Sequence, residues 1–306
     1  MATMSVRSWL LLGLLAGIWG SSYLLIALGL TGFEPAFVAF LRVFLAAAVV
    51  VPFGLRHWRT LSGHWRSLPL LAATQVAVPF VLISTAEQQL ASGLAGVLVA
   101  SQPLWLVVLM PLLRQGWPAL TSIAGTVTGF VGVALVVGPS GSGDVDPAAV
   151  AMMLGAALCY AFGAWWAKRT MTGVQPLAQT GATLTTATVL IAPVAAFQVP
   201  HELHLGASAA VVVLAVVGTG GAFVIYNRLI KDAGPARASL VSYLAPAVAL
   251  GYGATILHEP LGWNSVLGLA LILSGSWVSS RAPLRRRRAA AEVPVKETAV
   301  AGCTDR

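Results

Sequence analysis

Residues 9–30 read WLLLGLLAGIWGSSYLLIALGL, an apolar stretch broken only by glycines and the pair Ser21-Ser22. At a rise of about 1.5 Å per residue, a helix of this length crosses a hydrocarbon core about 30 Å thick. The stretch also exceeds the roughly 7–15 apolar residues of a secretory signal. We therefore expect a retained first membrane helix.

Similar apolar stretches recur along the whole chain. After the first, near residue 9, they begin near residues 35, 68, 94, 119, 148, 177, 207, 238 and 263, and each is roughly 18–24 residues long, which is enough to span a bilayer. Hydrophobic residues make up 58% of the chain and charged residues 9%, whereas about a quarter of a soluble domain is charged. The sequence predicts an all-α polytopic membrane protein with ten transmembrane helices.

Basic residues mark one side of the membrane. Of the 18 Lys and Arg, all except Arg42 lie before the first stretch, in alternate gaps between stretches, or in the tail. The other gaps contain no Lys or Arg, and their formally charged residues are all acidic: Glu34, Glu87, Asp144, Asp146, Glu202 and Glu259. By the positive-inside rule, we expect a multi-pass protein of the cell membrane, plasma or inner, with N- and C-termini in the cytoplasm.

The formal net charge of +8 does not indicate a nucleic-acid partner, because short loops and a tail carry the basic residues. We expect residues 281–306 to be a basic, disordered cytoplasmic tail. Its run Arg285–Arg288 is interpreted as an anchor to anionic lipid, with a partner-binding signal as the alternative. Cys159 lies in an apolar stretch and Cys303 in the tail, so neither a disulfide nor a metal site is indicated.

The two halves of the chain match at a shift of 143 residues. Pro103 pairs with Pro246, Gly125 with Gly268, Gly132 with Gly275, and Trp19-Gly20 with Phe162-Gly163. A constant shift at structure-breaking residues predicts a duplication into residues 9–138 and 148–280, joined by the flexible linker 138–144. Because each copy crosses the membrane five times, the second copy is inverted, as in many secondary transporters.

Short motifs occur in a characteristic order. They are Trp19-Gly20-Ser21-Ser22-Tyr23; Pro35 with Arg42; Ala86-Glu87-Gln88 before Ser92-Gly93-Leu94-Ala95-Gly96; Gln102-Pro103-Leu104-Trp105; Ser239-Leu240-Val241-Ser242-Tyr243-Leu244-Ala245-Pro246; and His258-Glu259-Pro260. In this order the chain resembles the EamA-type exporters of the drug/metabolite transporter superfamily over residues 9–280. The resemblance implies two EamA-like repeats of five helices, and a metabolite exporter of the inner membrane. It also implies a central cavity lined mainly by segments 1, 3, 4, 6, 8 and 9.

Two positions depart from that family. Many relatives carry a lysine where this chain has Ala27, and a glutamate in the turn after the fourth segment where it has Gly116. The second half keeps the equivalent residue, Glu259. Mechanisms that depend on the lysine or on the first glutamate are therefore in question for this chain.

Arg42 is the one formally charged side chain well inside an apolar stretch. An unpaired arginine at the bilayer centre costs roughly 2.5–3.5 kcal/mol on insertion scales. Arg42 can be the counter-ion of a substrate carboxylate or phosphate. Alternatively, its guanidinium binds carbonyls or hydroxyls of a neighbouring helix and stabilises the bundle, or extends to the outer interface.

Several polar and aromatic side chains lie at membrane depth and need partners there. The candidates for substrate binding are Arg42, Gln75, Gln102, Tyr160, Trp165, Tyr226 and Tyr243. Gln102 precedes Pro103, which can kink its helix and free a carbonyl group. The small-residue pairs Gly13/Gly17 and Gly125/Gly129 predict close helix packing.

Glu87 ends the third stretch on the predicted outer side, so it is the candidate for proton coupling; the alternative is a solvated or helix-end carboxylate that only marks the boundary. For Glu259 the same alternatives stand, and the flanking His258 and Pro260 favour a plain turn. The sequence does not indicate an enzyme. The linker 138–144 contains Gly-x-Ser-Gly and Gly-x-Gly-Asp, which are local signatures of membrane proteases, but no apolar stretch supplies the second aspartate or the general base that such chemistry requires. The segment His201-Glu202-Leu203-His204 lacks a further clustered ligand for a metal. No glycine-rich nucleotide loop is present.

These observations predict a secondary transporter that exports a small metabolite, an amino acid or related compound, by alternating access, with proton antiport as its coupling. The alternatives are an uncoupled uniporter or a membrane-embedded enzyme or sensor. We expect a small-molecule substrate and the lipid bilayer as partners, and neither a cofactor nor nucleic acid.

Overall fold

The computed structural model describes residues 5–138, 145–202 and 204–281, and every regular element within these ranges is a helix. Eight segments are long and apolar enough to cross a membrane: Val6–Leu30, Pro35–Leu61, Trp65–Ala86, Ser92–Leu109, Leu120–Val137, Pro147–Thr170, Pro176–Gln198 and Leu205–Ala233. The shorter apolar helix α13 (Val241–Ile256) and then α14 (Trp263–Arg281) follow them. The prediction of an all-α polytopic membrane protein is confirmed.

Among the described residues, five of the ten segments are single helices: α1 (Val6–Leu30), α7 (Leu120–Val137), α8 (Pro147–Thr170), α13 and α14. Helices α2 (Pro35–Gly54) and α9 (Pro176–Ala195) continue into the 3-10 turns η1 (Leu55–Leu61) and η4 (Ala196–Gln198). The short helix α12 (Pro235–Ala238) precedes α13.

Three spans are interrupted. The third contains η2 (Trp65–Ser67), α3 (Leu68–Ala72), the π-helical turn η3 (Ala73–Ala77) and α4 (Val78–Ala86). The fourth consists of α5 (Ser92–Val99) and α6 (Gln102–Leu109). The eighth contains α10 (Leu205–Ala215), the π-helical turn η5 (Val216–Gly221) and α11 (Ala222–Ala233). The interruptions place non-helical or widened backbone in the middle of the bundle.

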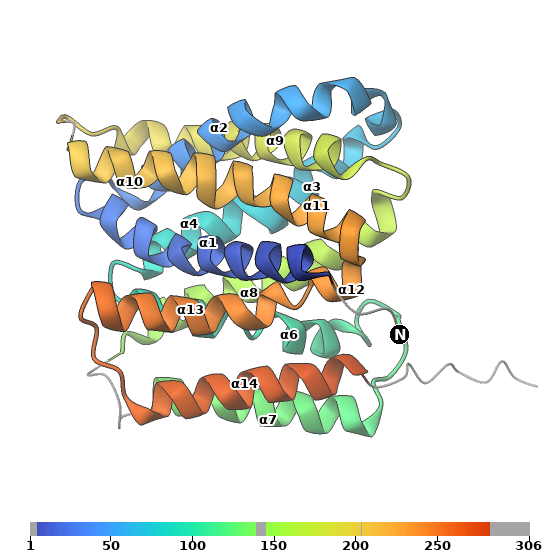
Figure 1. The fold of residues 1–306 in the computed structure, drawn as a ribbon, viewed down its shortest axis with the longest axis vertical. Helices are drawn as coiled ribbons and strands as arrows, with labels where there is room; N and C mark the ends of the chain where they lie inside the picture. Colours follow the sequence, from blue (N-terminus) through green and yellow to red (C-terminus); the bar gives the residue numbers. More distant parts are fainter. Residues whose placement is uncertain (1–4, 139–144, 203, 282–306) are drawn as a thin grey trace, which may run out of the picture.

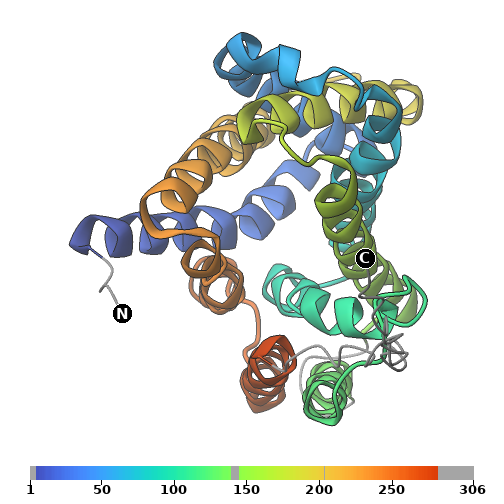
Figure 2. The same ribbon diagram turned by 90° about the vertical axis from the view of Figure 1, so that its right-hand side faces the viewer.

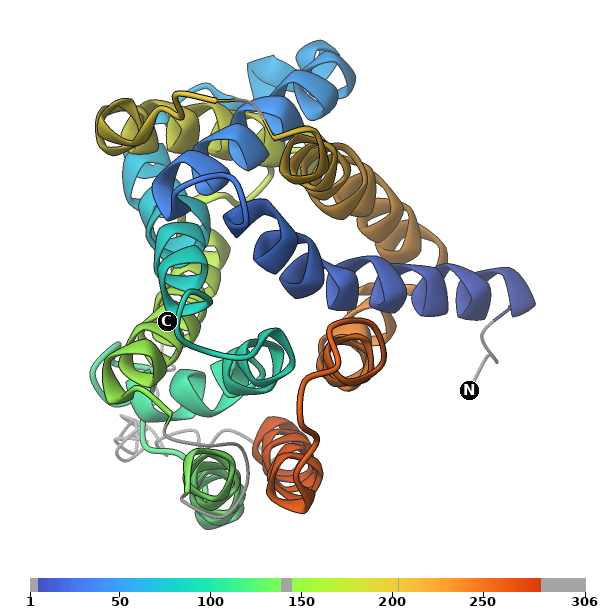
Figure 3. The same ribbon diagram turned by 90° about the vertical axis from the view of Figure 1, so that its left-hand side faces the viewer.

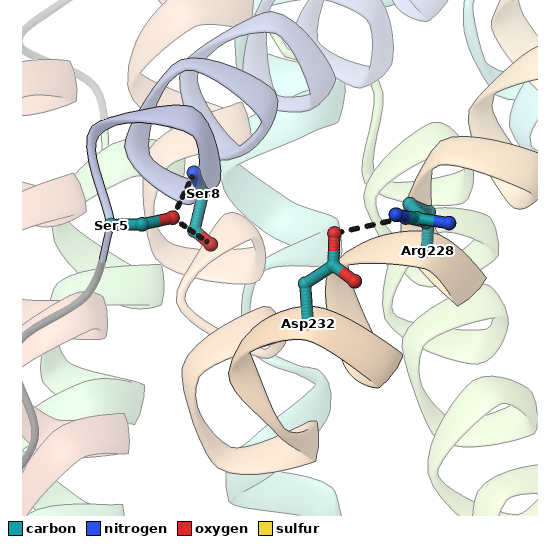
Figure 4. A network of polar contacts seen from close by, with 4 residues as sticks. All are labelled: Ser5, Ser8, Arg228 and Asp232. Atoms are coloured by element: carbon teal, nitrogen blue, oxygen red, sulfur yellow. Dashed lines mark hydrogen bonds and ion pairs between the residues drawn. The ribbon is translucent and has the colours of Figure 1, made fainter.

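Local sequence explains where the helices begin. The Ser5 hydroxyl accepts a hydrogen bond from the Ser8 amide at 3.2 Å and caps α1 (Figure 4). The Asp146 carboxylate accepts one from the Ala148 amide at 2.9 Å and caps α8. Such side-chain caps satisfy amide groups that have no partner within the helix. Figure 4 also shows Arg228, which pairs with Asp232 at 2.9 Å within α11.

The long helices run side by side (Figure 1). The pair α2 and α9 lies at one edge of the bundle and the pair α7 and α14 at the other, and both pairs are in contact. Viewed end-on, the remaining helices surround a central region (Figures 2 and 3). The largest cluster of buried apolar side chains lies where α1, α4, α5, α8 and α10 meet, and includes Ile26, Leu98 and Met153.

Glycines allow α7 and α14 to pack closely. A Cβ added to Gly125 would lie 2.7 Å from the Gly275 carbonyl oxygen and 2.7 Å from the Ser279 hydroxyl. The prediction of close packing at Gly125/Gly129 is therefore confirmed. The same prediction for Gly13/Gly17 is wrong. Among the described residues, no atom lies within 4 Å of a Cβ added at Gly13, and the one atom within 4 Å of a Cβ added at Gly17 is the Tyr252 hydroxyl oxygen, at 3.9 Å.

The π-helical turns occur at corresponding places in the two halves. Adding the shift of 143 residues to Ala73, the start of η3, gives Val216, the start of η5. This correspondence supports the predicted division into residues 9–138 and 148–280, which stays a prediction. Linker residues 139–144 and tail residues 282–306, including Arg285–Arg288 and Cys303, lie outside the described residues.

Candidate functional site

A cavity of about 570 Å³ lies within the bundle, a volume typical of small-molecule sites. Helices α1, α2, α4, α5, α6, α8, α11, α13 and α14 and the turns η3 and η5 contribute to its lining. The lining reaches Ser242 near the start of α13 and Ser280 near the end of α14. In Figure 1, α13 begins at the same end of the bundle as α1, so the cavity extends from the middle toward that end.

Six of the seven predicted substrate-binding residues line this cavity: Arg42, Gln75, Gln102, Tyr160, Tyr226 and Tyr243. Trp165 is not part of the lining. Its ring packs against Phe162 and Trp166, with centroids 5.4 and 6.0 Å away, and the Arg169 guanidinium carbon lies 5.8 Å from it. The structure thus brings six of the predicted residues together and places Trp165 in an aromatic cluster on α8.

Arg42, on α2, is fixed at two points. Its Nε donates to the Thr219 hydroxyl at 2.9 Å, and its guanidinium carbon lies 4.0 Å from the centroid of the Phe80 ring. The side chain is buried, yet it lines the cavity. In the described part of the chain, no hydrogen bond from its Nη groups is found. The two anchors therefore orient the guanidinium, and its terminal donors stay available to a ligand.

Thr219 connects the two halves, and the sequence analysis missed it. Its hydroxyl accepts from Arg42 of the first half and donates to the Leu214 carbonyl at 3.1 Å within its own helix. Thr219 lies in the π-helical turn η5, whose hydrogen-bond pattern departs from that of an α-helix. The run Gly218-Thr219-Gly220-Gly221 in an apolar stretch was the available signal.

Gln75 occupies the corresponding π-helical turn, η3, on another side of the cavity. Its amide nitrogen donates to the Tyr160 backbone carbonyl at 3.4 Å, which joins the third span to α8. π-Helical turns are frequent at functional sites. In this bundle both of them present side chains to the same cavity.

The helix break predicted near Pro103 is present. Helix α5 ends at Val99 and α6 begins at Gln102, with Pro103 in its first turn. Gln102 therefore faces the cavity from the start of a new helix. Its approximate counterpart Tyr243 also lines the cavity, and the Tyr243 hydroxyl lies 3.4 Å from that of Ser280.

An aromatic wall forms another part of the lining, defined here as Trp19, Phe223 and Tyr226. The Trp19 ring centroid lies 6.2 Å from that of Phe223 in an edge-on arrangement and 5.3 Å from that of Tyr226. Of these three, sequence reasoning named only Tyr226 as a binding candidate. Trp19 was noted only as part of a motif, and Phe223 was not noted, because the contact between α1 and α11 that brings the two rings together is not visible in the sequence.

Glu87 follows the third span directly and is 8% exposed. Among the residues that the structure describes, neither of its carboxyl oxygens has a hydrogen-bond partner, and both are buried from solvent. Burial raises the pKa of the Glu87 carboxyl well above its usual range; the Arg42 guanidinium opposes this rise, and Glu259 adds to it. Glu87 is the C-cap residue of α4, so it stands at a helix end as the alternative had it, but its carboxylate is not solvated. Proton coupling stays a prediction.

Glu259 lies in the loop between α13 and α14. Its Oε1 accepts from the Ser92 amide at 2.7 Å, and its Oε2 accepts from the Gly93 amide at 2.9 Å. These amides belong to the first turn of α5, whose N-cap residue Ala91 makes no side-chain cap. Glu259 therefore caps a helix of the other half, a contact that its appearance as a plain turn residue did not predict.

A helical bundle of membrane-spanning length around a polar and aromatic cavity defines a polytopic membrane transporter. The chain belongs to the EamA-like transporter family, whose sequence profile matches residues 7–138 and 147–281. This confirms the family resemblance inferred from the motifs.

Individual relatives match most of the chain. It is 29% identical over 266 residues to the "Uncharacterized inner membrane transporter YedA" of Escherichia coli strain K12, covering 84% of this chain and 85% of that protein. It is 25% identical over 287 residues to the "Probable terminal-alkyne amino-acid exporter" of Streptantibioticus cattleyicolor, covering 89% and 93%. A solved crystal structure with 20% identity has a similar fold, with a TM-score of 0.63 over 90% of this chain and 97% of the other.

Proposed function

We propose that this transporter exports a small metabolite with an anionic group, such as an amino acid or related compound, across the inner (plasma) membrane. The observation that carries the proposal is Arg42, a buried cation that lines the cavity and whose Nη groups have no hydrogen-bond partner in the described chain. Guanidinium groups bind carboxylates through paired hydrogen bonds. A relative named as an amino-acid exporter supports the export of such compounds.

Alternating access between the two halves is the proposed mechanism. The cavity extends toward the end of the bundle where α1 begins, and the Glu259 cap joins the halves at the start of α5. With cytoplasmic termini, as the basic loops indicate, this arrangement corresponds to a state open to the cytoplasm. Rocking of one half against the other would then expose Arg42 to the opposite side.

Proton antiport is the proposed coupling, with Glu87 as the proton carrier. Its buried carboxyl lies near enough to Arg42 and Glu259 to interact electrostatically with both. A proton arriving at Glu87 would change the field at Arg42, where the substrate anion binds. An uncoupled uniporter is the second candidate, and it is favoured by one observation: no carboxylate lines the cavity among the described residues.

The test is uptake of labelled amino acids and other metabolites into sealed, oriented proteoliposomes, with and without an imposed pH gradient. Accumulation that follows the gradient would support antiport, and equilibration that ignores it would support a uniporter. Arg42→Ala should abolish transport while membrane yield and melting temperature stay near those of the wild type. The control is Arg228→Ala, because Arg228 is outside the cavity lining. A parallel loss of yield in Arg42→Ala would assign Arg42 a structural role.

A further inference from the structure

We propose that the cavity selects an aromatic monocarboxylate that lacks a cationic amine. This inference rests on the transport function proposed above and narrows its substrate class, amino acids and related compounds, to the related compounds that lack the amine. An α-amino acid carries an ammonium beside its carboxylate, and the groups around Arg42 offer that ammonium no ionic partner. Three features carry the inference: the charge of the lining, the surroundings of the guanidinium, and the position of the aromatic wall.

The charge of the lining is the first feature. Arg42 is the sole formally charged side chain among the described residues that line the cavity. Glu87 interacts with Arg42 electrostatically, but its carboxyl oxygens are buried and it is absent from the lining. A ligand with one negative charge would therefore neutralise the cavity, whereas a phosphate dianion would exceed its single cation and a zwitterion would leave one positive charge unpaired.

The surroundings of the guanidinium are the second feature. In an α-amino acid the ammonium lies one carbon from the carboxylate, so binding of the carboxylate to Arg42 brings two positive charges close together. The guanidinium contacts the Phe80 ring and the Thr219 hydroxyl, whose proton is already donated to Leu214. Tyr23 and Tyr160 also line the cavity and interact with Arg42, but they are uncharged phenols. None of these groups compensates a buried ammonium by charge, and burying an unpaired charge is costly.

The aromatic wall is the third feature. Phe223 lies four residues after Thr219, and Tyr226 lies seven after it, along the span formed by η5 and α11. At about 1.5 Å per residue, these rings stand roughly 6 and 10 Å along the helix from the Arg42 anchor. Trp19 packs against both rings. If the carboxylate of a substrate binds Arg42, a flat apolar group that a short chain joins to this carboxylate would lie against Trp19, Phe223 and Tyr226.

The faces of aromatic rings also attract cations. An amine bound there would share the cavity with Arg42, and no lining carboxylate among the described residues would offset the two positive charges. Repulsion therefore opposes cationic ligands in the cavity as a whole, and we expect the wall to contact an uncharged ring.

The test uses three compounds that share a phenylethyl core and differ in their charged groups: 3-phenylpropionate, phenylalanine and 2-phenylethylamine. Binding of each to the purified full-length protein in lipid nanodiscs is measured by isothermal calorimetry at neutral pH. We expect 3-phenylpropionate to bind at least about ten-fold more tightly than phenylalanine, a difference of about 1.4 kcal/mol, because burying an unpaired charge is costly. The amine should show no saturable binding. Equal or tighter binding of phenylalanine, or binding of none of the three, would overturn the inference.

Variants test whether Arg42 causes the selection. Arg42→Gln keeps a hydrogen-bonding side chain without the charge, so the preference for 3-phenylpropionate over its neutral analogue 3-phenylpropanamide should disappear. Arg42→Lys should restore part of it, and the control Arg228→Gln should match the wild type. A preference that survives Arg42→Gln contradicts the assignment. If Arg42→Gln does not fold, the ranking of the three compounds on the wild type still decides.

Counterflow of labelled 3-phenylpropionate in proteoliposomes separates this inference from the proposed function. Exchange of phenylalanine in preference to 3-phenylpropionate would overturn the inference and leave the transport function intact. Tight binding of 3-phenylpropionate without exchange would contradict the transport function and keep the binding preference.

Discussion

The carboxylate of Glu259 caps the helix that begins at Ser92, at 2.7 Å from the Ser92 amide and 2.9 Å from the amide of the next residue. A negative charge at a helix N-terminus is favourable both as a hydrogen-bond acceptor and through the helix dipole. The bond joins the second half of the chain to the first. At the corresponding position of the first half stands Gly116, with a φ of 96° and no side chain. Gly116, which has no side chain, therefore cannot form the equivalent of this cap.

Glu259→Gln should weaken the cap of α5. The amide keeps one acceptor oxygen but loses the charge and the second acceptor. Hydrogen bonds to charged groups contribute about 1.5–3 kcal/mol each, so we expect a lower melting temperature in nanodiscs and a change in transport rate. The control is Glu34→Gln, because Glu34 precedes α2 without a side-chain cap. Equal effects of the two substitutions would show that the Glu259 contact is unimportant.

Glu87→Gln should change the dependence of stability on pH. Burial raises the pKa of the Glu87 carboxyl in the folded protein above its value in the unfolded chain, so the folded state binds the proton more strongly. Stability of the wild type should therefore fall as pH rises from the unfolded-state pKa through the raised one. The groups that interact with this carboxyl are Arg42, Tyr23 and Glu259.

Melting curves from pH 5 to pH 8.5 test this prediction. The variant should lack the alkaline loss of stability that Glu87 causes and should differ least from the wild type at the acidic end. If Glu87 also carries the coupling proton, transport by the Glu87→Gln variant should stop responding to a pH gradient. Parallel pH profiles for wild type and variant would refute a titrating Glu87.

Thr219→Val should weaken substrate binding. The substitution keeps the shape of the side chain and removes the oxygen that accepts from Arg42 Nε. With its anchor lost, the guanidinium is less well oriented, and we expect affinity for an anionic substrate to fall by about ten-fold, the effect of roughly 1.4 kcal/mol. Thr219→Ser keeps the hydroxyl and should bind nearly as the wild type does. A similar loss in both variants would mean that the methyl group, and not the hydroxyl, is important.

Gly125→Ala should destabilise the contact between α7 and α14. The new methyl group would meet backbone and hydroxyl oxygens of α14 at 2.7 Å, and such overpacking typically costs about 1–3 kcal/mol. Gly13→Ala is the matched control, since no atom lies within 4 Å of a Cβ at that position. Thermal unfolding should separate the two variants, and an unchanged Gly125→Ala would contradict the observed packing.

The segments and much of the cavity could be predicted from sequence because the bilayer imposes a simple rule. Each span needs about 20 apolar residues, so polar residues within a span need a protein or water partner. Arg42, Gln75 and Gln102 were therefore identifiable one by one. The angular position of a residue on its helix was harder to predict. Trp165 lies five residues after Tyr160, which at 3.6 residues per turn rotates it by about 140° away from the cavity.

Contacts between distant parts of the chain were not predictable in the same way. Glu259 meets Ser92 across 167 residues and Arg42 meets Thr219 across 177 residues. A helical threonine usually bonds to its own backbone, and a glutamate between His258 and Pro260 resembles a turn residue. Gly13 and Gly17 show the opposite error, because small-residue spacing predicts packing only when another helix lies over it.

The π-helical turns η3 and η5 also fix the rotational phase of their spans. A π-helical turn holds one residue more than the α-helical turn it replaces, so each residue after it faces about 100° away from where an uninterrupted α-helix would place it. Rewinding Ala73–Ala77 or Val216–Gly221 to α-helix without losing a residue would therefore rotate one side of the span relative to the other. In these two spans the local winding of the backbone sets which faces line the cavity, so a switch between π and α winding would change the lining without any change of sequence.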